Sequence, residues 1–279
     1  MNYLDQYLDK AHILLIFGGS FALMVIGVEL GFRFGSHWLG QQSKAQPSQV
    51  RSLMGAALGL LGFMLAFSFS IAQSHFELRA QAYLEEVRAI TSSYLSASFL
   101  DAGSSQKARA LLTEFVDSRV AIIELARDTS GDQQIAKALQ LVDRGEQIHH
   151  ELWQLGQAGD LTGQSPSARV FSESIIRLME ANEQRKQASI YNRISPVIWV
   201  TLILMSVLAM LVTGYQAGLS GSHSRLAIWS LGIIFAAVMA LVIDLDRPRM
   251  SLFQMNQQQM FDLQQQMHAD QPLVVPPGK

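Results

Sequence analysis

The segment EQIHHELW contains the one Glu-x-x-His spacing in the chain that could bind a metal ion. Glu146 and His149 share a helix face at this spacing, and His150 follows directly. A di-metal carboxylate site needs two such motifs and further carboxylates, and no second copy exists. We therefore interpret these side chains as solvated residues of a helix face and expect no metal or cofactor. Catalytic signatures such as a phosphate-binding glycine loop or a Gly-x-Ser-x-Gly turn are also missing from the sequence. We therefore expect that the protein is not an enzyme.

A second cluster of charges lies in LVIDLDRPRMSLF, directly after a hydrophobic stretch. Asp244 and Asp246 would stand at the C-terminal end of a helix, where the helix dipole disfavours carboxylates. We expect them to be held by cations, and Arg247, Arg249 and Arg79 are the candidates at the same membrane face. The preferred interpretation is a structural clasp at the membrane interface. Direct ion binding is the alternative.

A third pair of charges, Glu29 and Arg33, lies four residues apart inside a hydrophobic block. Charges within membrane segments are costly and seldom face lipid. One interpretation is a local ion pair near the headgroups, and the other is a role in a substrate or ion path.

The elements that must position these residues follow from the distribution of apolar residues. Of 279 residues, 49% are hydrophobic and 16% are charged, against roughly a quarter charged in soluble domains. The apolar residues concentrate in four blocks of about 20 residues, the length that crosses about 30 Å of hydrocarbon as a helix. The blocks cover residues 12–34, 53–72, 196–215 and 226–243. The sequence therefore predicts an all-α membrane protein with four transmembrane helices.

Between the second and third spans lies a long segment with helical periodicity. Apolar residues from Phe76 to Tyr94 recur at alternating steps of four and three, and no helix breaker separates them from the second span. We expect one long helix ending near residues 100–105, then helices over 106–127 and 133–155 and a fourth that starts at Pro166. A short amphipathic helix is expected within 253–268, and disorder after about residue 267.

Four spans place the termini and the long segment on one side of the membrane. Lys and Arg near the span ends are more frequent on that side, which predicts a cytoplasmic location for it in a cell inner (plasma) membrane protein. The predicted division is 1–73 with the first two spans, 74–195 as an inserted cytoplasmic helical domain, 196–245 with the last two spans, and 246–279 as a cytoplasmic C-terminal segment.

The second span carries two patterns of its own. Its glycines allow a close approach of another helix, which is either a neighbour in the chain or another subunit. Three large apolar residues at i, i+4 and i+8 share one face, which is either lipid-facing or core, or forms a hydrophobic constriction around an axis. The glycines are Gly55, Gly59 and Gly62, and the apolar residues are Phe63, Phe67 and Ile71.

Residues 62–100 and 241–255 resemble signatures of the bestrophin-like membrane family, a domain of unknown function. In that family a Gly-Leu-Leu-x-Phe-x-Phe-Ser span runs into a long helix, and a late span ends in Ile-Asp-x-Asp-Arg-Pro. Val87 and Ser96 stand where the family pattern has alanine and arginine, so no role of that arginine is carried over.

The resemblance implies a function. Bestrophins are pentameric chloride channels whose pore neck is lined by three apolar residues of the second span at the spacing of Phe63, Phe67 and Ile71. The acidic run that binds calcium in animal bestrophins is absent here. We expect a homo-oligomer, a pentamer by this analogy, that lies in the lipid bilayer and conducts small inorganic anions. The alternative is a non-conducting scaffold or sensor that acts through its cytoplasmic helices. A net charge of −2 without a basic stripe argues against a nucleic-acid partner.

Overall fold

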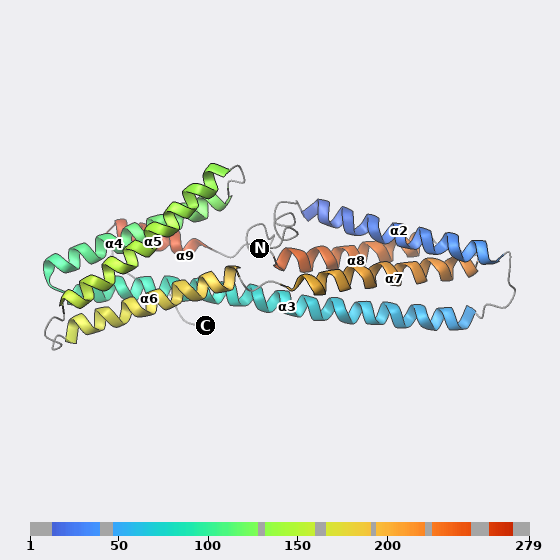
Figure 1. Ribbon diagram of the computed structural model, residues 1–279, viewed down its shortest axis with the longest axis horizontal. Coiled ribbons are helices and arrows are strands. Elements are labelled where there is room, and N and C mark those ends of the chain that lie inside the picture. The colour runs from blue at the N-terminus through green and yellow to red at the C-terminus, as the bar shows by residue number, and fades with distance from the viewer. Residues whose placement is uncertain are drawn as a thin grey trace. The chain divides into compact units, whose positions relative to one another are not determined.

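The computed structural model describes residues 13–39, 47–127, 132–159, 166–190, 194–220, 225–246 and 257–269. Within these ranges the chain is helical apart from short connections, and none of the described residues forms a strand (Figure 1). The all-helical fold predicted from the sequence is confirmed. The chain divides into two compact units, residues 1–76 with 193–253 (unit 1) and residues 77–192 with 254–279 (unit 2).

Unit 1 contains the four helices that are long and apolar enough to cross a membrane. They are α2 (Ile13–Leu39), the first half of α3 (Pro47–Ser96), α7 (Pro196–Ser220) and α8 (Arg225–Asp246). Each extends beyond the hydrophobic block that predicted it, because polar residues at the block ends continue the helical hydrogen bonding. The prediction of four apolar helices of membrane-spanning length is therefore confirmed.

The apolar core of unit 1 joins all four of these helices, and Ile16 is its buried member from α2. Leu61 and Leu65 of α3 pack with Leu202 of α7 and Met239 of α8, and all four side chains are buried. A second cluster joins α2 to α7 and α8 through Met24, Val28, Met210 and Ala236. Each helix of unit 1 thus buries one narrow face against its neighbours and leaves wide apolar faces exposed, as expected of helices solvated by lipid.

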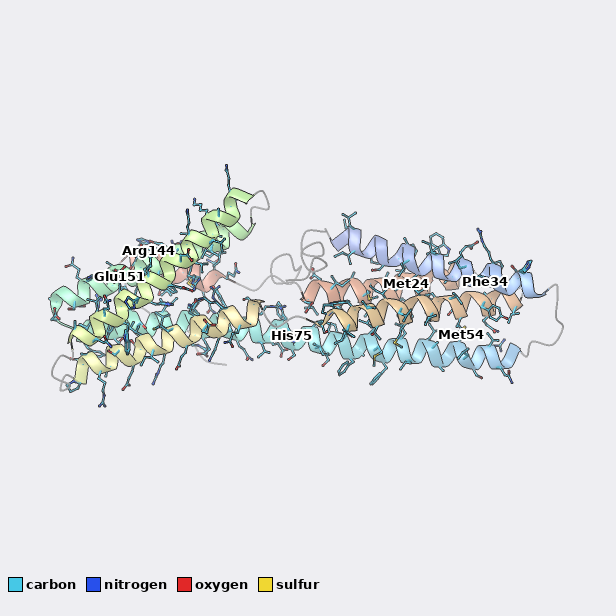
Figure 2. All side chains as sticks on the ribbon, viewed as in Figure 1. Met24, Phe34, Met54, His75, Arg144 and Glu151 are labelled. Atoms are coloured by element: carbon cyan, nitrogen blue, oxygen red, sulfur yellow. The ribbon has the colours of Figure 1, made fainter. Side chains whose placement is uncertain are left out.

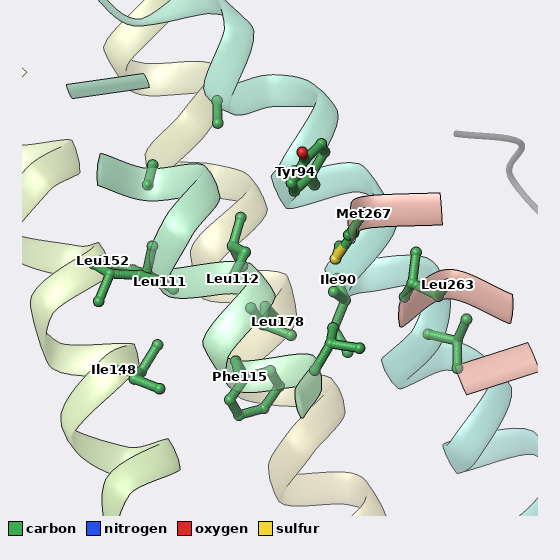
Figure 3. Close-up of a cluster of buried hydrophobic side chains, with 14 of the residues drawn as sticks. Ile90, Tyr94, Leu111, Leu112, Phe115, Ile148, Leu152, Leu178, Leu263 and Met267 are labelled. Atoms are coloured by element: carbon green, nitrogen blue, oxygen red, sulfur yellow. The ribbon is translucent and has the colours of Figure 1, made fainter. Parts of the chain in front are cut away.

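Unit 2 is a helical bundle around the second half of α3. It contains the 3-10 turn η1 (Ala97–Phe99), α4 (Ala102–Arg127), α5 (Asp132–Gly159), α6 (Pro166–Ile190) and α9 (Gln258–His268). The periodic residues from Tyr83 to Tyr94 enter its core as predicted, and Ile90 and Tyr94 lie among side chains from α4, α6 and α9 in Figure 3. The continuity of α3 over 50 residues confirms the prediction that the second span runs on as one helix.

Several helix boundaries differ from the prediction. Helix α4 begins at Ala102 rather than near residue 106, because Asp101 caps it: its Oδ2 accepts the Ser104 N–H at 3.0 Å and its carbonyl accepts the Ser105 N–H at 2.8 Å. Helix α5 continues to Gly159 instead of ending at residue 155. Helix α6 does start at Pro166, and α9 is a short helix close to its predicted range. The predicted disorder near the C-terminus falls on residues 270–279, outside the described residues.

Candidate functional site

The apolar stripe of α3 consists of Phe63, Phe67 and Ile71, and its first two side chains are exposed on the surface of the chain. Phe63 is 63% exposed and Phe67 is 53% exposed. Ile71 is half-buried and packs against Ala72, Ile194, Val242 and Leu245 of unit 1. The stripe therefore begins on the free surface of the helix and ends at its contact with the other helices of unit 1. A free apolar face of a membrane helix is covered either by lipid or by another subunit.

The glycines of the second span lie on open surface. A β carbon built on Gly55, Gly59 or Gly62 meets no other atom within 4 Å. Within the described part of the chain, no neighbouring helix uses these glycines for close approach. Contact of these glycines with another subunit, the alternative to packing within the chain, remains a proposal.

Close helix approach occurs instead between α2 and α7, where the sequence analysis did not expect it. A β carbon on Gly31 would overlap the Leu211 carbonyl, and one on Gly214 would overlap the Val28 carbonyl. Further along, a β carbon on Gly35 would lie 2.5 Å from the carbonyl oxygen of Tyr215. The signal was present in the sequence, because glycines recur every four residues in GVELGFRFG, and GYQAG repeats the spacing on the second helix.

Glu29 and Arg33 form a local ion pair on the exposed surface of α2. Arg33 Nε lies 3.0 Å from Glu29 Oε1, and the two side chains are 75% and 53% exposed. The local ion pair is present, and its position near the headgroups stays a prediction.

Two contacts of Asp246, at the end of α8, lie within the described residues. Asp246 Oδ1 accepts the backbone N–H of Ile194 at 3.0 Å, and His75 Nδ1 lies 3.8 Å from the same oxygen. Asp246 thus ties the end of α8 to the start of α7 and lies beside α3 (His75 is labelled in Figure 2). His75 follows Ile71 by one helical turn, a position that the sequence analysis did not consider.

The other members of the predicted clasp are placed as follows. Asp244 is buried in the last turn of α8, with 1% of its surface exposed. Arg79 is buried in the part of α3 that belongs to unit 2. Arg247 and Arg249 lie outside the described residues. The arginine partners predicted for these carboxylates remain a prediction.

Unit 2 contains a buried ion cluster that the sequence analysis missed. Glu86 of α3 has no exposed surface; its Oε1 lies 3.0 Å from Arg119 Nη2 of α4, and its Oε2 lies 2.8 Å from Arg185 Nε of α6. Arg119 also donates to Asn182 Oδ1 and stacks over the Phe115 ring at 4.8 Å. Burial lowers the pKa of Arg119 to about 10, although Glu86 opposes the shift. One carboxylate therefore joins three helices in the core.

His149 corrects another expectation. It is buried against Phe115, with ring centroids 4.8 Å apart, rather than solvated. Burial lowers its pKa to about 4, and the nearby Arg119 charge acts in the same direction. His150 is exposed as expected and bonds Gln154, while Glu146 binds Lys186 at 2.7 Å. No group of three or more potential metal ligands occurs among the described residues.

The exposed face of unit 2 carries a further ion network. Arg144 of α5 forms an ion pair with Glu114 of α4 at 2.7 Å. It forms a second ion pair, at 2.8 Å, with Glu151, which lies two turns further along α5. Arg144 and Glu151 lie on α5 in Figure 2. Because these side chains are partly solvated, the network links α4 to α5 without the cost of burying charge.

Comparison with known proteins identifies the family. The profile of the bestrophin-like domain matches residues 20–249, which include the membrane helices and most of the helical bundle. No curated protein and no solved structure matches the chain. Since the domain covers most of the sequence, the chain belongs to the bestrophin-like family.

Proposed function

We propose that the protein is an oligomeric ion channel whose pore is lined by α3 and which conducts small anions. The observation that carries the proposal is the free surface of α3. Of the four candidate spans it has the lowest buried share of its most apolar window, 17% against 28%, 28% and 39%. This least covered span is also the one that bears the Phe63 and Phe67 stripe and the open glycines.

A single chain with this arrangement does not enclose a path, so the proposal requires several copies. In a homo-oligomer with α3 around the axis, the open glycines allow close packing of neighbouring subunits. The phenylalanines then form apolar rings, and an ion must shed water to pass between them. A pentamer with unit 2 in the cytoplasm follows the family resemblance.

The test combines structure and current. Single-particle images along the membrane normal give the number of subunits and reveal any axial opening. Purified protein in planar bilayers is expected to show unitary currents, and reversal potentials in asymmetric KCl give the charge preference. One feature counts against anions, because the apolar block 53–72 of the second span contains no Lys or Arg. A cation-selective reversal potential would contradict the anion part of the proposal.

Replacing Phe63, Phe67 and Ile71 with Ala tests the lining. If the three side chains form a dry constriction, the variant conducts more, because water stays in the wider passage. Ile71 packs within the chain, so some loss of stability is expected, whereas core packing of all three would cost roughly 2–5 kcal/mol each. A folded oligomer with unchanged currents would remove these residues from the pore.

A scaffold or sensor is the second candidate, and exposed apolar side chains on α6 favour it. Val170, Ile176 and Met179 are each at least 40% exposed in unit 2. Exposed apolar residues outside a membrane can mark a protein contact when they form a patch. Absence of current from well-folded oligomers in bilayers would favour this candidate over the channel.

A further inference from the structure

The N-terminus of α9 is capped by a side chain from another helix. The Tyr83 hydroxyl of α3 donates to the Gln257 carbonyl at 2.9 Å and accepts the N–H of Met260 at 3.1 Å. Gln257, at the N-cap position, makes no side-chain capping bond of its own. The Met260 N–H also donates to the Gln257 carbonyl at 3.2 Å. The first N–H groups of a helix lack the usual partners within it, so the Tyr83 hydroxyl adds a side-chain acceptor at the start of α9.

The other end of α9 is anchored to α4. Asp117 Oδ1 accepts a hydrogen bond from Gln264 Nε2 at 2.7 Å and lies 2.9 Å from His268 Nε2. The two ends of the helix are thus fixed by polar side chains of two different helices. The Tyr83 ring belongs to the apolar core, but its hydroxyl can be removed by itself, and Asp117 is 41% exposed, so each anchor can be removed without leaving a large cavity.

The apolar contact of α9 is small. Its buried side chains are Met260, Leu263 and Met267, which belong to the same buried cluster as Tyr83, Val87, Ile90 and Tyr94 of α3. Figure 3 shows Leu263 and Met267 beside Ile90 and Tyr94. Helix α4 contributes twice as many buried apolar side chains to the same cluster. They are Ala108, Leu111, Leu112, Phe115, Val116 and Val120. A helix of 11 residues is not stable alone, and elements with few buried contacts are the first to open.

We propose that α9 is a detachable latch on α3. It undocks while α3, α4, α5 and α6 stay folded, and in the docked state it restrains the continuation of the membrane helix α3. In the sequence α9 follows the fourth span after residues 247–256, so docking links the chain beyond that span to α3. Control of conduction by the latch rests on the proposed channel function, whereas the latch itself does not.

Hydrogen exchange of the full-length protein in nanodiscs tests the latch. Amides of α9 are expected to exchange at least tenfold faster than those of α4 and α6. Tyr83→Phe removes only the hydroxyl and is expected to accelerate exchange in α9 by about tenfold, with α4 and α6 unchanged. Asp117→Ala removes the other anchor and should act in the same way.

Tyr94→Phe is the matched control. Tyr94 lies on the same face of α3, but its hydroxyl makes no hydrogen bond within the described part of the chain. This variant is expected to leave exchange in α9 unchanged. If α9 exchanges at the rate of α4 and α6 in the wild type and in both anchor variants, it is an ordinary core helix and the latch is refuted.

Single-channel recording tests the regulatory part. If docked α9 restrains α3, Tyr83→Phe weakens that restraint. The mean open and closed times of the variant should then be several-fold shorter at unchanged unitary conductance. Identical dwell times in wild type and variant would overturn regulation by the latch. Absence of current in the wild type would instead refute the channel and, with it, control of conduction, while the exchange data would still decide whether α9 detaches.

Discussion

Replacing Glu86 with Gln should destabilise unit 2 far more than the same change at the neighbouring Glu85. Glu86 is fully buried between Arg119 and Arg185. Removing one partner of a buried ion pair leaves an uncompensated charge and costs about 3–5 kcal/mol. Arg185 is 26% exposed and can turn towards water, whereas the Arg119 side chain is 6% exposed and cannot. Because only one of the two arginines, Arg119, would stay buried without its partner, we expect the lower end of the range, about 3 kcal/mol.

Glu85→Gln provides the control within the same helix turn. Glu85 pairs with Arg88 at 2.6 Å, but its side chain is 55% exposed. Exposed ion pairs contribute about 0–1 kcal/mol, so this variant should unfold almost as the wild type does. The two variants remove the same charge and differ only in burial.

Urea unfolding of the full chain in detergent measures the difference. Trp153 is the sole tryptophan of unit 2, so its fluorescence reports on this unit once Trp38, Trp199 and Trp229 are replaced by Phe. With a slope of about 2 kcal/mol per molar urea, a loss of about 3 kcal/mol lowers the midpoint by about 1.5 M. Midpoints of the Glu86 and Glu85 variants within about 0.3 M of each other would show that the cluster is solvated.

Three further predictions concern other contacts. Gly31→Ala should lower the melting temperature in detergent, because its β carbon overlaps the Leu211 carbonyl, while Gly19→Ala, on open surface of the same helix, should not; equal melting temperatures would contradict the close contact of α2 and α7. His149 has a folded pKa of about 4 against about 6.5 when unfolded, so unit 2 should lose about 3 kcal/mol as pH falls from 6.5 to 4, and urea midpoints of His149→Leu should lack this dependence. Asp246→Ala should cost about 1–3 kcal/mol by leaving a backbone N–H without its acceptor, whereas Asp246→Asn, which keeps an acceptor oxygen, should cost less in the same thermal assay.

The sequence by itself determined the elements of this protein. Four apolar blocks of sufficient length became four apolar helices, because length and hydropathy depend on residues next to one another in the chain. The absence of a helix breaker after the second span correctly predicted the single helix α3. The steps of four and three between Tyr83 and Tyr94 correctly identified its buried face, because helical periodicity is also a local property.

Only the tertiary structure decided which partners those faces have. Glu85 and Glu86 are adjacent and chemically alike, yet one turns to solvent and the other meets arginines from two helices distant in sequence. His149 and His150 separate in the same way. A step of one residue rotates a side chain by about 100° around a helix, so burial depends on where the neighbouring helices lie.

The glycines show the same limit in the membrane helices. Gly59 and Gly31 are both members of small-residue patterns, but only Gly31 meets another helix within the described chain. The glycine pattern indicates that another helix can approach closely. Only the packing of α2 against α7 shows which of the glycine-containing helices is approached in this way. Such pairings depend on contacts between segments far apart in the sequence, which spacing along one segment does not encode.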